Sequence, residues 1–206
     1  LLIIVVGTVL VGLSSWNLVS EARTQEEIIV ENLPEFSIKI KENIKQTVLG
    51  IDGNTVKETK VAEKELVVKK ALAPNGKYYD TVAYLSIPSL GIKYPVLAKT
   101  TTELLKVSLN KYWGANPNQV GNFCIVGHNY NDNRFFGKLN QIKQGAEIII
   151  TEMDGEALSY YVYQTDMIDP YDTSCTSQLT NGRKEITLIT CNYDGSQRFI
   201  AKARAN

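Results

Sequence analysis

The segment TLITCNYDGSQRF, from Thr187 to Phe199, decides both the fold class and the candidate site. It begins with β-branched and aliphatic residues, passes through a turn rich in Asn, Asp and Gly, and then starts a second apolar run. Side chains alternate along a strand, so Thr187, Ile189 and Cys191 share one face. If the loop NYDGSQ closes an antiparallel hairpin, Cys191 and Arg198 lie directly opposite each other, with Cβ atoms roughly 4.5–5.5 Å apart.

A thiol beside a guanidinium is poised for nucleophilic chemistry. The cation favours the thiolate and lowers the pKa of the cysteine from its reference value of about 8.5. Arginine cannot act as a base, but its donors suit an oxyanion or a peptide carbonyl. A thiol nucleophile also needs a proton partner, and the chain holds a single histidine, His128, directly after Gly127 in the apolar run FCIVGH. We therefore expect Cys191 as nucleophile, His128 as its partner and Arg198 as the donor.

The composition excludes several other classes of protein. The 206 residues carry 22 Lys+Arg and 22 Asp+Glu, so the net charge is zero and the basic excess of a nucleic-acid-binding protein is missing. One histidine and three widely spaced cysteines match neither a zinc-ligand spacing nor a disulfide framework. No glycine-rich phosphate loop or HExxH motif is present.

The chain divides into three parts by composition. Residues 1–20 contain no charged residue and fit a transmembrane helix, which needs roughly 20 apolar residues; a cleaved secretory signal is the alternative interpretation. Residues 21–77 are rich in charges of both signs and are expected to form a juxtamembrane linker. From residue 78 onward the sequence has the pattern of a folded domain, which we expect to span 78–206.

The residue pattern of this third part predicts a mainly β fold. Short apolar runs separated by Gly, Asn and Asp clusters indicate strands within 82–98, 123–128, 146–151, 158–168, 185–191 and 198–204. A capping-box spacing between Thr100 and Glu103, followed by Leu105, Leu109 and Tyr112 on one helical face, predicts a short helix over 101–112. Many short strands with few helices favour a β-barrel or a sandwich.

These residues resemble a known family, the sortases, which are membrane-anchored cysteine transpeptidases of Gram-positive bacteria. The resemblance covers roughly Tyr84 to Arg204 and includes IPSLGIKYPVL, the GHN segment followed by FFGKLNQIKQGAEI, and TLITC followed by Arg198. The T-L-x-T-C element is specific, whereas the IP and PV elements are weak alone. The resemblance implies an eight-stranded sortase-type β-barrel with short helices, preceded by the N-terminal transmembrane helix and the charged linker.

The resemblance also implies an activity. Cys191 would attack the threonine carbonyl of an LPxTG-like C-terminal sorting signal on a surface protein and form a thioacyl-enzyme. His128 would protonate the leaving amine and then activate an incoming amine, supplied by a lipid-linked cell-wall precursor or by a pilin lysine. Arg198 would hold the substrate carbonyl and the oxyanion, and Lys202 and Arg204 share its strand parity. The domain would lie on the extracellular face of the cell membrane, and no nucleic acid would take part.

The subclass is partly readable from the sequence. The interval between His128 and Cys191 leaves no room for the long helix of class B enzymes. The Asp-Pro-aromatic segment at 169–171 lies between those two residues, whereas the lid of pilus-type enzymes lies upstream of the barrel. A class A-like or class D-like enzyme is therefore favoured. The alternatives are a surface-anchored, non-catalytic module that binds a peptide or wall polymer, and another cysteine enzyme of the wall.

Other residues are candidates for smaller roles. Gly127 and Thr190, the neighbours of the expected catalytic pair, are expected to contact the substrate. Cys124 is interpreted as a buried strand cysteine, and Cys175 belongs to a long loop expected to border the substrate groove. No cofactor is required by this interpretation. Calcium is kept as an alternative, because hard cations prefer oxygen ligands and the candidate ligands are acidic: Glu147, Glu152, Asp169 and Asp172.

Overall fold

The computed structural model describes residues 64–206, so the predicted anchor and most of the predicted linker lie outside the described residues. No helix within this described part is long and apolar enough to cross a membrane. The elements, in chain order, are β1 (Lys69–Leu72), β2 (Tyr78–Ile87), η1 (Pro88–Leu90), β3 (Ile92–Leu97), α3 (Thr102–Leu105), β4 (Leu109–Gly114), β5 (Gly121–Val126), η2 (Leu139–Gln141), β6 (Glu147–Glu152), β7 (Ala157–Ile168), η3 (Ser174–Thr176), β8 (Lys184–Cys191) and β9 (Arg198–Ala205).

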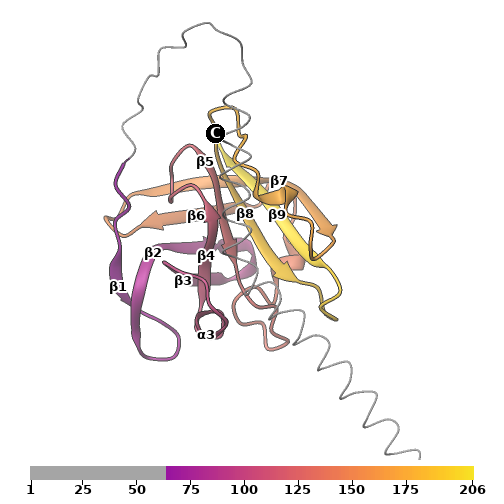
Figure 1. The fold of residues 1–206 in the computed structure, drawn as a ribbon, viewed down its shortest axis with the longest axis horizontal. Coiled ribbons are helices and arrows are strands. Elements are labelled where there is room, and N and C mark those ends of the chain that lie inside the picture. The colour runs from indigo at the N-terminus through magenta and orange to yellow at the C-terminus, as the bar shows by residue number, and fades with distance from the viewer. Residues whose placement is uncertain (1–63) are drawn as a thin grey trace, which may run out of the picture.

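The strands form a closed barrel (Figure 1). They follow the order β1-β2-β3-β4-β5-β8-β9-β7-β6, and β2 also pairs with β6, which closes the ring through β2–β9. Strand β1 adds to the ring at β2 from outside the closure. Most neighbours are antiparallel, but β5 runs parallel to β8, and this pairing brings together two segments that are far apart in the sequence. The predicted eight-stranded, mainly β barrel is confirmed.

The alternation of side chains explains where the core lies. Along β6 every second residue is buried, as expected for a barrel wall with one face inside and one face wet. Strand β8 is different, because five consecutive residues of it are buried. Its Ile186 and Leu188 join the main core, whereas Ile189 belongs to a smaller cluster with Cys175 and Ile200 on the other face. The segment around η3 therefore covers the outer face of the barrel wall at β8.

The helix predicted over 101–112 is wrong beyond its first turn. Helix α3 ends at Leu105, and its N-cap is Thr101, whose Oγ1 accepts a hydrogen bond from the backbone N–H of Leu104 at 3.2 Å. Beyond the helix, Ser108 Oγ donates a hydrogen bond to the backbone carbonyl of Pro95 at 2.6 Å, which ties this segment to β3. The chain continues as β4, in which Leu109 is fully buried.

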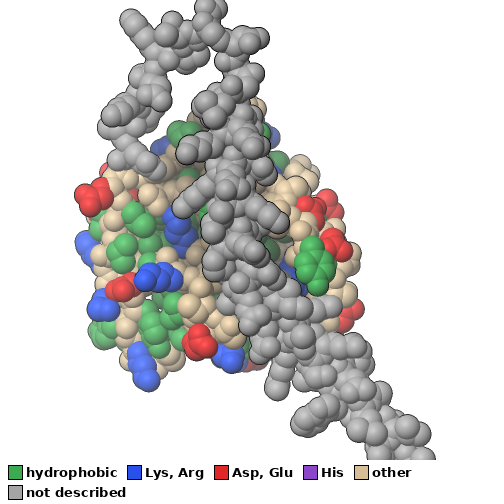
Figure 2. All heavy atoms as spheres, in the orientation of Figure 1, with side chains coloured by type: hydrophobic (Ala, Val, Ile, Leu, Met, Phe, Trp, Pro, Cys, Tyr) green, Lys and Arg blue, Asp and Glu red, His purple; other side chains and the backbone are tan. Residues whose placement is uncertain are grey.

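Charges of both signs cover the barrel surface. Figure 2 shows basic and acidic side chains interspersed on the face of the described residues that it draws. This agrees with the net charge of zero for the whole chain.

Strand β1 begins at Lys69, ahead of the expected domain start at 78, and its register with β2 runs from Lys69 opposite Thr81 to Leu72 opposite Tyr78.

Candidate active site

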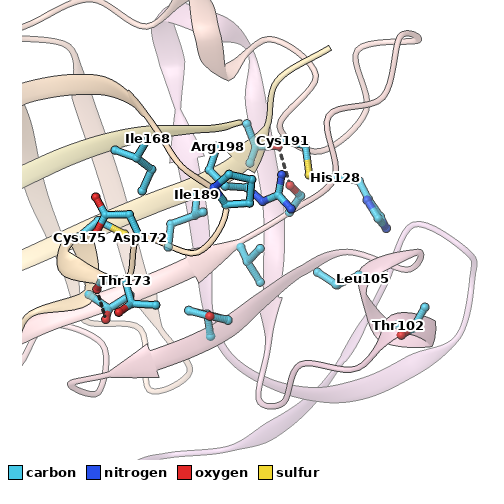
Figure 3. A pocket seen from close by; sticks show the side chains of 16 residues that line it. Thr102, Leu105, His128, Ile168, Asp172, Thr173, Cys175, Ile189, Cys191 and Arg198 are labelled. Carbon is cyan, nitrogen blue, oxygen red and sulfur yellow. Dashed lines mark hydrogen bonds between the residues drawn. The ribbon is translucent and has the colours of Figure 1, made fainter. Parts of the chain in front are cut away.

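A pocket lies on the outer face of the barrel wall, under the loop that joins β7 to β8 (Figure 3). Its lining includes all three residues expected from the sequence to carry chemistry, namely His128, Cys191 and Arg198. Much of the rest of the lining is apolar. It consists of Leu105 and of four members of the small cluster on the outer face of β8: Tyr112, Ile168, Cys175 and Ile189. The loop that carries Cys175 borders this pocket, and the expectation that it borders the substrate groove stays a prediction.

The β8–β9 hairpin places the thiol opposite the guanidinium. In the antiparallel register Cys191 is the partner of Arg198, which confirms the relationship expected from the loop length. Lys202 and Arg204 pair with Thr187 and Glu185 further down the hairpin, so Arg198 is the one cation of the three that lines the pocket. The geometry thus separates Arg198 from two alternatives that share its strand parity.

The parallel pairing of β5 with β8 places the histidine at the level of the cysteine. The ladder register ends with Val126 beside Ile189, and His128 and Cys191 each lie two residues beyond that pair. Both side chains are half-buried and line the pocket. Figure 3 shows Cys191 between His128 and Arg198 at one end of the pocket. The three side chains therefore come from the ends of three neighbouring strands.

The guanidinium of Arg198 is held by the loop that precedes it. Its Nη1 donates to the carbonyl of Gly195 at 3.0 Å and to that of Gln197 at 3.1 Å. The residue is 5% exposed, and its Nη2 is buried with no hydrogen-bond partner among residues 64–206. A buried donor without an acceptor is costly, which makes this nitrogen a ready donor for a ligand oxygen.

An aromatic and charged loop supports the histidine from the other side. The imidazole of His128 lies against the ring of Tyr130, with centroids 5.2 Å apart, and the guanidinium of Arg134 lies 4.5 Å over the same ring. Asp132 holds that guanidinium at 2.7 Å, and hydrogen bonds from Arg134 keep the pKa of the Asp132 carboxyl below its usual range. Sequence reasoning missed Tyr130, and its signal was only its place two residues after the single histidine.

Gly127 and Thr190, the two expected substrate contacts, both line the pocket and also contact each other. The hydroxyl of Thr190 donates to the carbonyl of Gly127 at 2.7 Å, and Thr190 is 2% exposed. A Cβ at position 127 would lie 2.5 Å from Leu109 Cδ2 and 2.9 Å from Phe136 Cδ2. Any larger residue here would force Leu109 and Phe136 to shift. A contact of either residue with substrate stays a prediction.

The other two cysteines are buried; Cys175 belongs to the small apolar cluster, and Cys124 Sγ donates to the carbonyl of Asn122 at 3.7 Å. Burial raises the pKa of the Cys175 thiol to about 11 and raises that of Cys124 well above its usual range. The same cluster raises the pKa of Tyr112 to about 12, chiefly through burial. Cys124 is the buried strand cysteine that the sequence predicted. Neither thiol is prepared to act as a thiolate, whereas Cys191 is half-buried at the pocket.

The four acidic residues considered as calcium ligands do not form one group. Glu147 Oε1 accepts a hydrogen bond from Ser159 Oγ at 2.7 Å, and Asp172 Oδ1 accepts one from the backbone N–H of Ser174 at 2.8 Å. Within residues 64–206, one cluster of three ligand-type side chains has its atoms within 4.8 Å of one another: Glu152, Asp154 and Glu156.

The ammonium of Lys64 already balances that cluster. Its Nζ lies 3.0, 2.9 and 2.6 Å from carboxylate oxygens of Glu152, Asp154 and Glu156. Of the four residues expected from the sequence, only Glu152 belongs to it. The described residues therefore offer no support for the calcium alternative as it was drawn from the sequence.

Two curated proteins are similar in sequence to this chain. The chain is 41% identical over 73 residues to the sortase-type protein YwpE of Bacillus subtilis (strain 168), which covers 35% of this chain and 69% of that protein. It is 29% identical over 127 residues to sortase A of Bacillus anthracis, covering 59% of this chain and 58% of that protein. The chain thus spans less than two thirds of this second relative.

Solved sortase structures share the fold. Sortase A from Corynebacterium diphtheriae matches with a TM-score of 0.59 at 20% identity, over 95% of each chain. A Clostridium perfringens sortase D5 transpeptidase matches with a TM-score of 0.56 at 24% identity, over 89% of this chain and 99% of that one. Listeria monocytogenes sortase A matches with a TM-score of 0.56 at 26% identity, over 61% of this chain and 87% of that one. Residues 85–206 match the family model of the sortase domain, and the chain therefore belongs to the sortase family of cysteine transpeptidases.

Proposed function

We propose that this enzyme cleaves an LPxTG-like sorting signal on a surface protein and joins that protein to an amine of a cell-wall precursor. The observation that supports the proposal is the convergence of Cys191, His128 and Arg198 on one pocket. The apolar lining of that pocket suits the aliphatic residue that opens such a motif. In this proposal the enzyme acts at the cell surface, held to the membrane by its N-terminal segment.

The first half-reaction acylates the enzyme. The sulfur of Cys191 attacks the carbonyl carbon of the motif's threonine, a C–S bond forms, and the carbonyl electrons move onto oxygen. Nη2 of Arg198, buried without a partner among the described residues, donates to this oxyanion or to the neighbouring carbonyl. When the oxyanion collapses, the C–N bond breaks and His128 delivers the proton that the leaving amine needs.

The second half-reaction transfers the acyl group to the acceptor. The nitrogen of the incoming amine attacks the thioester carbon, His128 accepts the proton that this nitrogen loses, and the C–S bond breaks to return the Cys191 thiolate. The products are one new amide bond and the free enzyme, so no cofactor is consumed. Water in place of the amine would give hydrolysis, and the apolar lining of the pocket disfavours water.

Cysteine replacement tests the proposal. We expect Cys191→Ala to abolish both cleavage of an LPxTG peptide and its joining to an added amine, as followed by mass spectrometry. Cys124→Ala and Cys175→Ala are the matched controls, because they remove thiols that are buried rather than half-buried. A thioester-linked adduct should form on Cys191 and disappear on addition of hydroxylamine. Retention of full activity in Cys191→Ala would end the proposal.

A further inference from the structure

We propose that Asn129 is a positioning residue for the nucleophile, a role that rests on the proposed function of Cys191. Its side-chain Nδ2 donates a hydrogen bond to the backbone carbonyl of Cys191 at 3.0 Å. Asn129 is the last residue of the GHN segment, and the catalytic scheme above uses only the histidine of that segment. The contact links the residue after the histidine directly to the backbone of the cysteine.

The contact replaces a missing rung of the parallel ladder. The last backbone bond between the two segments runs from the N–H of Gly127 to the carbonyl of Ile189, at 3.2 Å. Bonds in a parallel ladder recur every second residue, so the next would join the N–H of Asn129 to the carbonyl of Cys191. That carbonyl receives the side-chain amide of the same residue, Asn129. The side chain thus occupies the place that the main chain would have taken.

The main chain is engaged elsewhere because it has begun to turn. Asn129 forms an isolated antiparallel bridge with Phe135, and the carbonyl of His128 accepts from the N–H of Phe136 at 3.0 Å. This turn directs the imidazole toward the ring of Tyr130 at the pocket's edge. Asn129 thus supplies the bond between the two segments at the point where the histidine and the cysteine must face the same substrate.

A second side chain ties the same two strand ends together. Thr190 donates to the carbonyl of Gly127 at 2.7 Å, so one bond runs from β8 to the histidine segment and another runs back from Asn129 to Cys191. The two bonds run in opposite directions; on the histidine segment they involve the two neighbours of His128, and on β8 they involve Thr190 and Cys191 itself. Preorganisation of this kind matters because a displacement of about 1 Å can cost on the order of 100-fold in rate.

The test compares Asn129 with Asn131 in the full 206-residue chain. Asn129→Ala removes the donor, and Asn129→Asp keeps the shape but replaces the donor with a second acceptor. Asn131 is exposed and lies two residues further along the same loop, so Asn131→Ala and Asn131→Asp are matched controls. We expect both Asn129 variants to lower kcat about 10- to 100-fold with an LPxTG peptide. KM should change by less than about threefold, because the substrate itself does not touch this amide. The Asn131 variants should keep both constants.

A second readout needs no peptide. The rate at which iodoacetamide alkylates Cys191 is followed against pH, with peptide mapping to separate the three cysteines. We expect the Asn129 variants to shift the midpoint of this profile, since the thiol loses its fixed placement beside His128 and Arg198, and the Asn131 variants to superimpose on the native chain. Asn129→Gln, which restores an amide on a longer arm, should recover part of the lost kcat. If Asn129 served only the stability of the fold, its variants would have lower melting temperatures, but the folded molecules would keep the native pH dependence of Cys191 alkylation.

The outcomes separate this inference from the proposed function. If Cys191→Ala stays active, the proposed function fails; if Cys191→Ala is inactive while folded Asn129→Ala and Asn129→Asp match the native kcat and alkylation profile, only the positioning role fails. Should Asn129→Ala not fold, Asn129→Asp decides, because it is nearly isosteric. Failure of every Asn129 variant to fold would assign the residue to the fold and would also overturn the positioning role.

Discussion

Cys191 and Arg198 are register partners at the loop end of the β8–β9 hairpin, on either side of the connecting residues 192–197. The thiol belongs to the last residue of one strand and the guanidinium to the first residue of the next. Two carbonyls of that loop, from Gly195 and Gln197, fix Nη1, so the loop that joins the two residues also orients the arginine. The hairpin therefore positions both residues and also forms part of the pocket lining.

Within the Arg198 guanidinium, Nη1 binds the loop and Nη2 is left to donate to a ligand, so we predict that lysine cannot replace this arginine. Arg198→Lys keeps the charge, but its three donors radiate from one nitrogen, which cannot occupy the positions of both Nη1, held by two loop carbonyls, and Nη2. We expect kcat to fall about 100- to 1,000-fold, as for the loss of an oxyanion donor. The fall in kcat is measured by steady-state kinetics with an LPxTG peptide. Arg204→Lys is the matched control, since Arg204 lies on the same strand but covers the ring of Tyr163 at 4.7 Å. Equal losses in both variants would show that the effect is not local to the pocket.

Close packing at Gly127 predicts a different kind of defect. In Gly127→Ala the new methyl group would meet Leu109 and Phe136, which are both fully buried. We expect a loss of about 1–3 kcal/mol in the free energy of unfolding, as for overpacked cores, together with lower activity because His128 is the next residue. Urea unfolding measures the loss. Adding Leu109→Ala should make the double variant more stable than the sum of the two single losses predicts. An unperturbed Gly127→Ala chain would contradict the packing argument.

The relationships that the sequence could predict are the local ones. The alternation of side chains and the length of one loop are enough to place Cys191 opposite Arg198, because both facts lie within a single hairpin. The position of His128 beside them depends on the parallel pairing of β5 with β8, which joins segments 63 positions apart. No local pattern encodes that pairing, and the resemblance to sortases supplied it.

The misses follow from the same limit. The spacing of Leu105, Leu109 and Tyr112 fits a helical face, but from Leu109 the chain pairs as strand β4 with β3 and β5, and this tertiary pairing overrides the local pattern. Strand β1 was hidden in a charged stretch because only one of its four residues is buried. The role of Asn129 depends on a side chain that reaches across to another strand, and residue type alone does not reveal such a contact.

Burial of the second pocket thiol predicts a loss of stability in alkali. The folded state raises the pKa of Cys175 from 9.0 to about 11, so between these values the folded chain keeps a proton that the unfolded chain has released. The free energy of unfolding must therefore fall as the pH rises from 9 to 11, by about 1.4 kcal/mol for each pKa unit. Below pH 9 this contribution is fully present.

Replacement of that thiol checks the assignment. Cys175→Ala should flatten the dependence of unfolding free energy on pH between 9 and 11, as measured by urea unfolding with a reducing agent present. Ser174→Ala is the matched control, because it alters the neighbouring residue without removing an ionisable group and should leave the alkaline slope unchanged. A slope that is identical in all three chains would mean that Cys175 titrates alike in the folded and unfolded states.

The ion cluster at the β6–β7 turn predicts that the segment before β1 is held by charge. Lys64 Nζ faces three carboxylates, of which Glu152 is only 9% exposed, and it keeps the pKa of Asp154 below its usual range. In Lys64→Met these carboxylates would repel one another without a counter-ion, so the melting temperature should drop at low ionic strength. About 1 M NaCl, with a Debye length of about 3 Å, should remove most of the difference.

Two further variants distinguish the effect of this cluster from that of an ordinary exposed ion pair: a matched lysine substitution, and a second substitution within the cluster. Lys70 pairs with Asp80 at 3.1 Å, but both side chains are mostly exposed, so Lys70→Met should leave the melting temperature nearly unchanged. Glu156→Gln added to Lys64→Met removes one repelling carboxylate and should recover part of the loss. The depressed pKa of Asp154 means that its share of the stabilisation is present above pH 3.8 and is lost as the pH falls through its lower folded value. The native chain and Lys64→Met should therefore converge in acid, and a gap that persists there and in high salt would show that Lys64 acts through packing instead of charge.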